Sequence, residues 1–169
     1  MPIAYALLNS IMQIHKLRLR DFRNYETHEM EWAPHLNLLT GPNGAGKTSL
    51  IDAVHYLCMS RSFVSNSDQY CVRFKQKSFE IEGSFSGKIR SRFDMSLAYT
   101  KGKGKEIRVN QSPLEKLTDL IGRVPVVVLS PEDKMLTSEG PILRRSYIDY
   151  FICQLSRVYL DALLEYKRV

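Results

Sequence analysis

The fold of this chain follows from the stretch Gly41-Pro42-Asn43-Gly44-Ala45-Gly46-Lys47-Thr48. It fits the P-loop pattern G-x-x-x-x-G-K-[ST], in which glycines let backbone N–H groups turn towards phosphate oxygens. Lys47 can then reach the β- and γ-phosphates of ATP, and the Thr48 hydroxyl can ligate Mg²⁺. The predicted nucleotide-binding residues are Gly41, Pro42, Asn43, Gly44, Ala45, Gly46, Lys47, Thr48 and Ser49.

The residues on either side of this loop have the expected patterns. Residues 36–39 are mostly apolar and predict a short buried strand, and residues 48–57 predict a helix with Leu50, Ile51 and Val54 on one face. A strand, a loop and a helix N-terminus in this order form a phosphate site, because the helix dipole adds to the attraction of the amides for phosphate. A chance glycine turn would not explain the lysine, the threonine and both flanks together.

Bulk composition excludes several classes of protein. The chain has 169 residues, about one domain on a prior of roughly 100–200 residues per domain. Its hydrophobic content of 44% excludes a disordered chain, and its net charge of +6 favours polyanionic partners such as nucleic acid. The cysteines Cys58, Cys71 and Cys153 have no C-x-x-C spacing, so we expect reduced thiols in a cytoplasmic protein. No stretch is apolar for long enough to span a membrane.

Alternating apolar and polar residues predict antiparallel strands. The alternation runs through residues 79–85 and 89–99, and a lysine–glycine turn at 101–105 leads to a returning strand at 106–110. These segments predict a β subdomain over about residues 72–110. Further strands are expected around residues 14–19 and 28–32, with the second pairing back on the first, and a short helix is expected from Pro113 to Gly122.

The second half contains a further predicted strand and helix. Residues 124–129 are nearly all apolar, as in a strand that is buried on both faces. Ser130 and Pro131 then resemble a helix N-cap and first helical position. Glu132 is a candidate for the carboxylate that ATP hydrolysis requires, but an acidic residue in a first helical turn also stabilises the helix dipole.

The two ends of the chain are expected to differ in kind. Residues 1–11 resemble an extension ahead of the first strand, and Met12 is an alternative start. From Pro141 onward, apolar residues at helical spacing predict one long helix that reaches Val169 without a C-cap. We therefore expect the natural chain to continue as a helical arm.

Four blocks of sequence resemble the RecF family of bacterial recombination mediators. They are residues 12–25, which end in Phe-Arg-Asn-Tyr, the P-loop at 41–48, residues 56–63, which end in Ser-Arg-Ser-Phe, and residues 129–149, which contain Pro-Glu-Asp, Arg-Arg and Ile-Asp. The resemblance implies an α/β P-loop NTPase, specifically an ABC-ATPase-like half-head related to SMC proteins, with an antiparallel β subdomain and the start of a helical arm. Residues 12–140 would form the head and residues 141–169 the truncated arm.

The same resemblance implies a function. In the family, two heads form a homodimer around ATP, and the dimer binds DNA at junctions between single strand and duplex. It assists recombinase loading at gaps, together with other recombination mediator proteins. The signature motif and Walker B strand lie further along than residue 169, so we expect weak DNA-stimulated ATPase activity from the whole dimer and none from this part alone. Two alternatives stay open: an SMC-like or nuclease-associated head, and a nucleotide-gated DNA-binding module without turnover.

Basic residues supply the other candidate contacts. Arg23 follows the first predicted strand and could contact the phosphates or base of the nucleotide, or be a solvated turn arginine. The lysine–glycine turn could contact DNA phosphates without reading sequence, or be an edge hairpin that its lysines protect from aggregation. Arg144 and Arg145 could bind phosphate or pair with acidic neighbours. The candidate DNA contacts are Lys101, Lys103, Lys105, Arg144 and Arg145.

Overall fold

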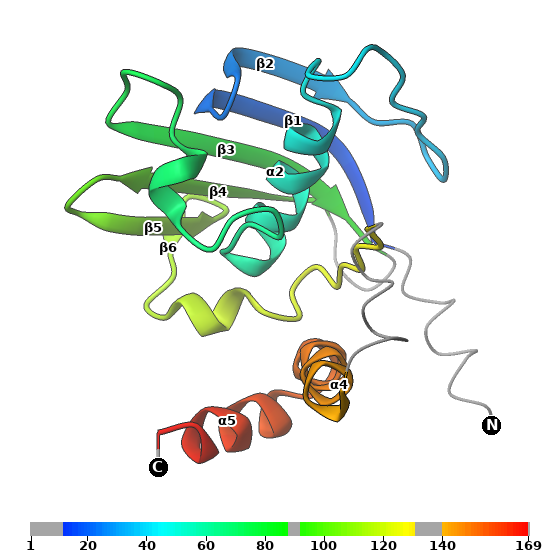
Figure 1. The fold of residues 1–169 in the computed structure, drawn as a ribbon, viewed down its shortest axis with the longest axis vertical. Helices are drawn as coiled ribbons and strands as arrows, with labels where there is room; N and C mark the ends of the chain where they lie inside the picture. The colour runs from blue at the N-terminus through cyan, green and yellow to red at the C-terminus, as the bar shows by residue number, and fades with distance from the viewer. Residues whose placement is uncertain (1–11, 88–91, 131–139, 169) are drawn as a thin grey trace.

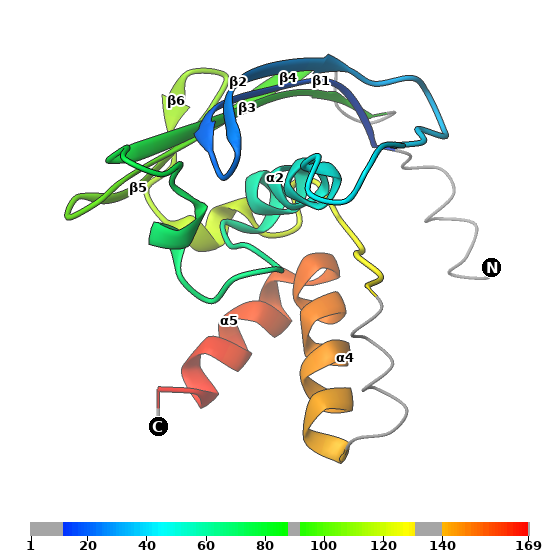
Figure 2. The same ribbon diagram turned by 45° about the horizontal axis from the view of Figure 1, so that its top comes forward.

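The computed structural model describes residues 12–87, 92–130 and 140–168. Its centre is a six-stranded antiparallel sheet in the order β2-β1-β3-β4-β5-β6, with helix α2 packed against one face (Figures 1 and 2). The strands are β1 (Gln13–Phe22), β2 (Tyr25–Glu31), β3 (Ser78–Ser86), β4 (Phe93–Thr100), β5 (Gly104–Val109) and β6 (Ser112–Pro113). The helices are α2 (Lys47–Met59), α4 (Pro141–Leu155) and α5 (Arg157–Tyr166), with 3-10 turns η1 (Asp68–Cys71) and η2 (Leu117–Leu120).

Period-two alternation determines which face of the sheet is buried. Leu17 of β1, Ile81 of β3 and Leu97 of β4 are fully buried and point to the face that α2 covers. Gly83 allows the close approach of this helix, because a Cβ there would lie 2.6 Å from Leu57 of α2. The core therefore lies between α2 and the sheet.

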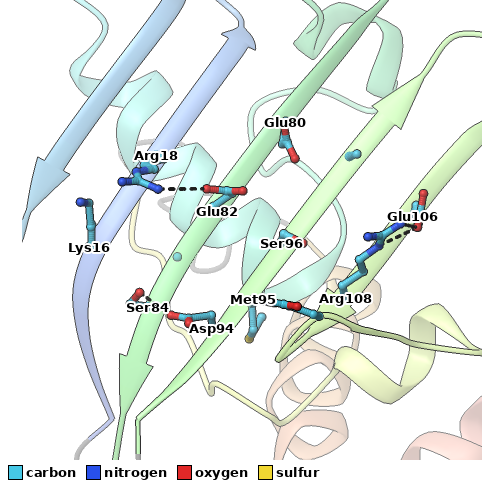
Figure 3. Close-up of a pocket in the computed structure, with 13 residues that line it drawn as sticks. Lys16, Arg18, Glu80, Glu82, Ser84, Asp94, Met95, Ser96, Glu106 and Arg108 are labelled. Carbon is cyan, nitrogen blue, oxygen red and sulfur yellow. Dashed lines mark hydrogen bonds and ion pairs between the residues drawn. The ribbon is translucent and has the colours of Figure 1, made fainter.

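The opposite face of the sheet is charged. It forms a shallow hollow, shown in Figure 3, in which acidic and basic side chains alternate. Lys16 pairs with Glu29 at 2.5 Å, Arg18 pairs with Glu82 at 3.7 Å, and Arg108 pairs with Glu106 at 2.6 Å. Because its charges are mutually paired, this face offers little net attraction to a polyanion.

The predicted antiparallel strands are confirmed, but the sheet is larger than expected. β1 pairs with both β2 and β3, so both of the first strands belong to the same sheet as the segment at about 72–110. Within the described residues, the antiparallel β segment and the first two strands therefore form one continuous sheet.

Two predicted strands are wrong. Residues 36–39 and 124–129 form no strand, and Leu36, Leu38 and Leu129 have 83%, 82% and 83% of their surface exposed. A strand needs a neighbouring strand to pair with. Here, backbone groups of both segments form hydrogen bonds with a turn carbonyl or with a side chain instead. Leu36 N–H donates to Pro34 O at 3.0 Å in a turn. Residue 126 is bonded through both its N–H and its C=O by the side-chain amide of Gln154.

The predicted helix from Pro113 is mostly absent. Pro113 pairs with Arg108 in the β5–β6 ladder, and Leu114 N–H donates to Ile107 O at 2.9 Å. The ladder thus uses residues that the helix would need, and only the turn η2 forms. Its Leu120 is fully buried, as the apolar pattern predicted.

The predicted single helix after Pro141 is two helices, which diverge at Ser156 (Figure 2). Ser156 has extended backbone angles, φ −135 and ψ 113, and its hydroxyl accepts from Tyr159 N at 3.2 Å, which caps α5. Arg157 then donates to Asp119 at 2.8 Å, which fixes the start of α5 against η2. The N-cap and this anchor end the first helix and begin a second, although the apolar residues keep their helical spacing across Ser156.

The predictions for Glu132 and for the N-terminal extension concern residues outside the described ranges, because residues 131–139 and 1–11 are not described. Among the helices of the described ranges, none has the length and apolar character needed to cross a bilayer.

Candidate phosphate-binding site

The predicted P-loop forms the approach to α2. Gly46 is the N-cap residue, and its φ of 95 is in the left-handed region that favours glycine. A Cβ at this position would lie 2.5 Å from Asn24 Nδ2 and 2.8 Å from Tyr25 Oη. Tyr25 also donates its hydroxyl to Gly46 O at 3.3 Å. The β1–β2 turn therefore holds the end of the loop, and only glycine fits there.

Lys47 occupies the position that its motif predicts, at the first residue of α2. Its ammonium donates to the carbonyls of Gly41 at 2.8 Å and Pro42 at 2.7 Å, so the loop curls around this side chain. The first turn of α2 has no acidic residue and no side-chain cap. Its N–H groups and the positive end of the helix dipole are thus available to an anion. Thr48 is exposed beside them.

Arg23 makes a buried ion pair that the sequence did not reveal. Its Nη2 lies 2.7 Å from Oδ2 of Asp52, and its Nε lies 3.0 Å from the same oxygen. Asp52 is fully buried, and the Arg23 side chain is only 18% exposed. The interpretation of Arg23 as a solvated turn residue is therefore wrong. Contact between Arg23 and a nucleotide stays a prediction. It would require part of the guanidinium to turn away from Asp52.

Asp52 also organises the loop after α2. It accepts from Ser62 Oγ at 2.9 Å and from Phe63 N at 2.9 Å. The signal for this role was an aspartate in the middle of an apolar helix. Ile51, which was expected on the buried face, is 44% exposed, and Asp52 beside it is buried. The carboxylate joins the β1–β2 turn, α2 and the following loop into one unit beneath the P-loop.

His55 links α2 to α4. Its Nδ1 lies 2.9 Å from Arg61 O, and its Nε2 lies 3.1 Å from the Tyr150 hydroxyl. Burial lowers the pKa of this imidazole, which favours its neutral form. These contacts give His55 a structural role between α2 and α4. Across the described ranges, no group of three or more histidine, cysteine or acidic side chains could hold a metal ion.

The basic candidates divide into two kinds. Lys101 and Lys103 are exposed at the β4–β5 turn, and Arg144 and Arg145 are exposed on α4. Lys105 was wrongly grouped with them. Its Nζ lies 3.0 Å from Asp68 Oδ2, donates to Ser60 O, and sits over the Tyr56 ring at 5.2 Å from its centroid. It stabilises the negative C-terminal end of α2 and is not available to DNA.

We expect Gly46→Ala to destabilise the protein more than Gly44→Ala. Both glycines have positive φ, at 95 and 81, so each substitution introduces backbone strain of about 1–3 kcal/mol. Only at Gly46 does the new Cβ meet other atoms, since nothing lies within 4 Å of a Cβ at Gly44. Urea unfolding of the two variants measures the difference. Equal losses would show that Asn24 and Tyr25 do not restrain the loop.

Comparison with known proteins adds independent findings. The family model described as AAA domain matches residues 16–157. The DNA replication and repair protein RecF of Salinibacter ruber is 46% identical over 158 residues, which cover 93% of this chain and 38% of that protein. RecF of Clostridioides difficile is 40% identical, with 93% and 42% covered. The chain spans about two fifths of the length of these relatives.

Solved structures agree in fold. The recombination mediator RecF with ATP superposes with a TM-score of 0.87 at 29% identity, over 94% of this chain and 44% of that one. A structure from work on ATP-driven dimerisation and DNA-stimulated activation of SMC ATPases gives a TM-score of 0.67 at 16% identity, over 81% and 98%. The second likeness concerns the fold alone. Together they establish the P-loop NTPase fold.

Proposed function

This chain belongs to the AAA domain family and is similar to the N-terminal part of RecF proteins, and on this premise we propose that it is the ATP-binding head of a DNA replication and repair protein. The observation that carries the proposal is the P-loop at the N-terminus of α2, where Lys47 donates to the carbonyls of Gly41 and Pro42 and the first helical turn has no acidic residue and no side-chain cap. The similarity of the RecF–ATP structure over 94% of the chain supports it.

The residues present fit a magnesium–nucleotide complex. The N–H groups of the loop and of the first turn of α2 would bind phosphate oxygens, and Thr48 would ligate Mg²⁺. The bound ion neutralises phosphate charge and orients the γ-phosphate. Lys47 would exchange the carbonyls of Gly41 and Pro42 for phosphate oxygens. Because those carbonyls are neutral acceptors and phosphate is charged, the exchange favours the nucleotide-bound loop.

ATP would also bring two heads together. Residues 41–45 and Thr48 are exposed, so the nucleotide would keep one open side that a second head can cover. The dimer would bind DNA at junctions between single strand and duplex, assist recombinase loading at gaps, and act with other mediator proteins. The net charge of +6 supports a polyanionic partner. Turnover would depend on a carboxylate and a signature motif, and Glu132 is the only candidate that we put forward from this chain.

Light scattering with and without ATP–Mg²⁺ tests dimerisation. The complete protein should double in mass with ATP and stay unchanged with AMP, and phosphate release should increase with DNA. The 169-residue chain alone should release no phosphate above background. A complete protein that binds ATP but keeps the mass of a monomer would contradict the dimer. One that binds DNA and releases no phosphate would be a nucleotide-gated binding module.

A further inference from the structure

Two large aromatic side chains stand exposed at one end of the sheet. Tyr70 is 70% exposed at the end of η1, and Phe74 is 84% exposed in the loop that leads to β3. They border a hollow of about 650 Å³. Three lysines from the same loop and from the β4–β5 turn also line it. We call this cluster the aromatic platform, and it consists of Tyr70, Phe74, Lys75, Lys77 and Lys101.

Backbone hydrogen bonds hold the platform in place. Lys101 N–H donates to Lys77 O at 2.9 Å, which ties the β4–β5 turn to the loop before β3. Gln76 N–H donates to Arg73 O at 3.0 Å and closes the turn that carries Phe74. Arg73 pairs with Glu26 at 2.8 Å, which fastens this turn to the start of β2. Figures 1 and 2 both show these segments at the same end of the sheet. The aromatic rings are thus carried on fixed backbone.

The charge of the platform is of one sign. Within the described ranges, Lys75, Lys77 and Lys101 make no ion pair with a carboxylate, and Lys75 Nζ lies 5.6 Å from the centre of the Phe74 ring. The nearby acids Glu26 and Asp21 are engaged by Arg73. The other face of the sheet, where Lys16 and Arg18 are paired, contrasts with this arrangement. A ligand for the platform is therefore anionic and presents flat apolar surfaces.

We propose that the aromatic platform binds single-stranded nucleic acid, with bases stacked on Phe74 and Tyr70 and phosphates beside the lysines. This inference rests on the proposed function, and it assigns part of the proposed DNA contact to the aromatic platform. Exposed aromatic rings beside basic side chains are how proteins hold unpaired strands, because every unpaired base offers a ring face. A duplex keeps its base faces stacked and gains only the lysine contacts.

The β1–β2 turn connects the platform to the P-loop. A second hollow joins Phe74 and Lys75 to Arg23 and Asn24. Asn24 also contacts the P-loop, because a Cβ on Gly46 would lie only 2.5 Å from Asn24 Nδ2. Nucleotide and single strand would therefore bind to neighbouring loops that share the β1–β2 turn.

Fluorescence anisotropy with the complete protein tests the proposal. The probes are a labelled oligothymidylate and an abasic strand of equal length, which keeps the phosphates and lacks the bases. Phe74→Ala should weaken oligothymidylate binding by about 5- to 150-fold and leave abasic binding unchanged. Lys101→Ala should weaken binding to both, and should flatten the log–log salt dependence by about 0.7 for one lost phosphate contact. Tyr166→Ala is the matched control, since Tyr166 is 79% exposed on α5.

The outcomes separate the two proposals. If Phe74→Ala binds oligothymidylate as the unchanged protein does, the platform is not the contact surface, although DNA binding itself stands. If Phe74→Ala weakens both probes equally, the ring does not stack with bases and the proposal is wrong. If the unchanged protein binds neither the oligothymidylate nor a labelled duplex of the same length, the proposed DNA function fails as well. Unchanged ATP affinity in each variant shows that the head is folded.

Discussion

Lys47→Ala is expected to abolish ATP binding at concentrations where the unchanged protein is saturated. The substitution removes the only lysine of the P-loop, whose ammonium already sits within the curl of the loop against Gly41 and Pro42. Hydrogen bonds to charged groups contribute about 1.5–3 kcal/mol each, so the loss of contacts to two phosphates lowers affinity by several orders of magnitude. Isothermal titration calorimetry with ATP–Mg²⁺ measures it.

Two comparisons make this result specific. Lys116→Ala removes an exposed lysine ahead of η2 and should leave ATP affinity unchanged. Thr48→Ala should weaken binding with Mg²⁺ more than binding without it, because its hydroxyl is assigned to the metal. Equal ATP affinity for Lys47→Ala and the unchanged protein would overturn the P-loop assignment.

Asp52→Ala is expected to cost about 3–5 kcal/mol of unfolding free energy, because it leaves Arg23 partly buried without its counter-charge. The same change removes the acceptor for Ser62 Oγ and Phe63 N. Urea unfolding at neutral pH gives the difference. ATP affinity should fall too, since the β1–β2 turn that touches Gly46 loses its link to α2.

Glu29→Ala is the control for that measurement. Glu29 forms ion pairs with Lys16 and Arg18 on the solvent-facing side of the sheet, and exposed pairs contribute little to stability. A loss for Asp52→Ala no larger than that for Glu29→Ala would mean that the buried pair does not support the site.

Local sequence patterns predicted the elements that local rules control. The alternation along β3 and β4, and the lysine–glycine turn between β4 and β5, predicted antiparallel strands, since inward and outward positions follow directly from period two. The P-loop was predicted residue by residue, because its chemistry requires glycine, lysine and threonine at set spacings.

Longer-range contacts were beyond such rules. Apolar residues at 124–129 indicated a strand, but the Gln154 amide takes the backbone of Val126, and no local pattern announces that contact. Lys105 resembled its neighbours on the turn until the structure placed Asp68 beside it. Asp52 was hidden for the same reason, since its partner Arg23 lies 29 residues earlier in the chain. Burial of a charge can be predicted only when its partner is known.

The central claim is that ATP binds at the N-terminus of α2, and a crystal structure of the protein with ATP and Mg²⁺ tests it most directly. We predict that the β- and γ-phosphates lie against the N–H groups of residues 44–48, that Thr48 ligates the metal, and that Lys47 Nζ has left the carbonyls of Gly41 and Pro42 for phosphate oxygens. Nucleotide bound elsewhere, or bound here with Lys47 still on those carbonyls, would contradict the account.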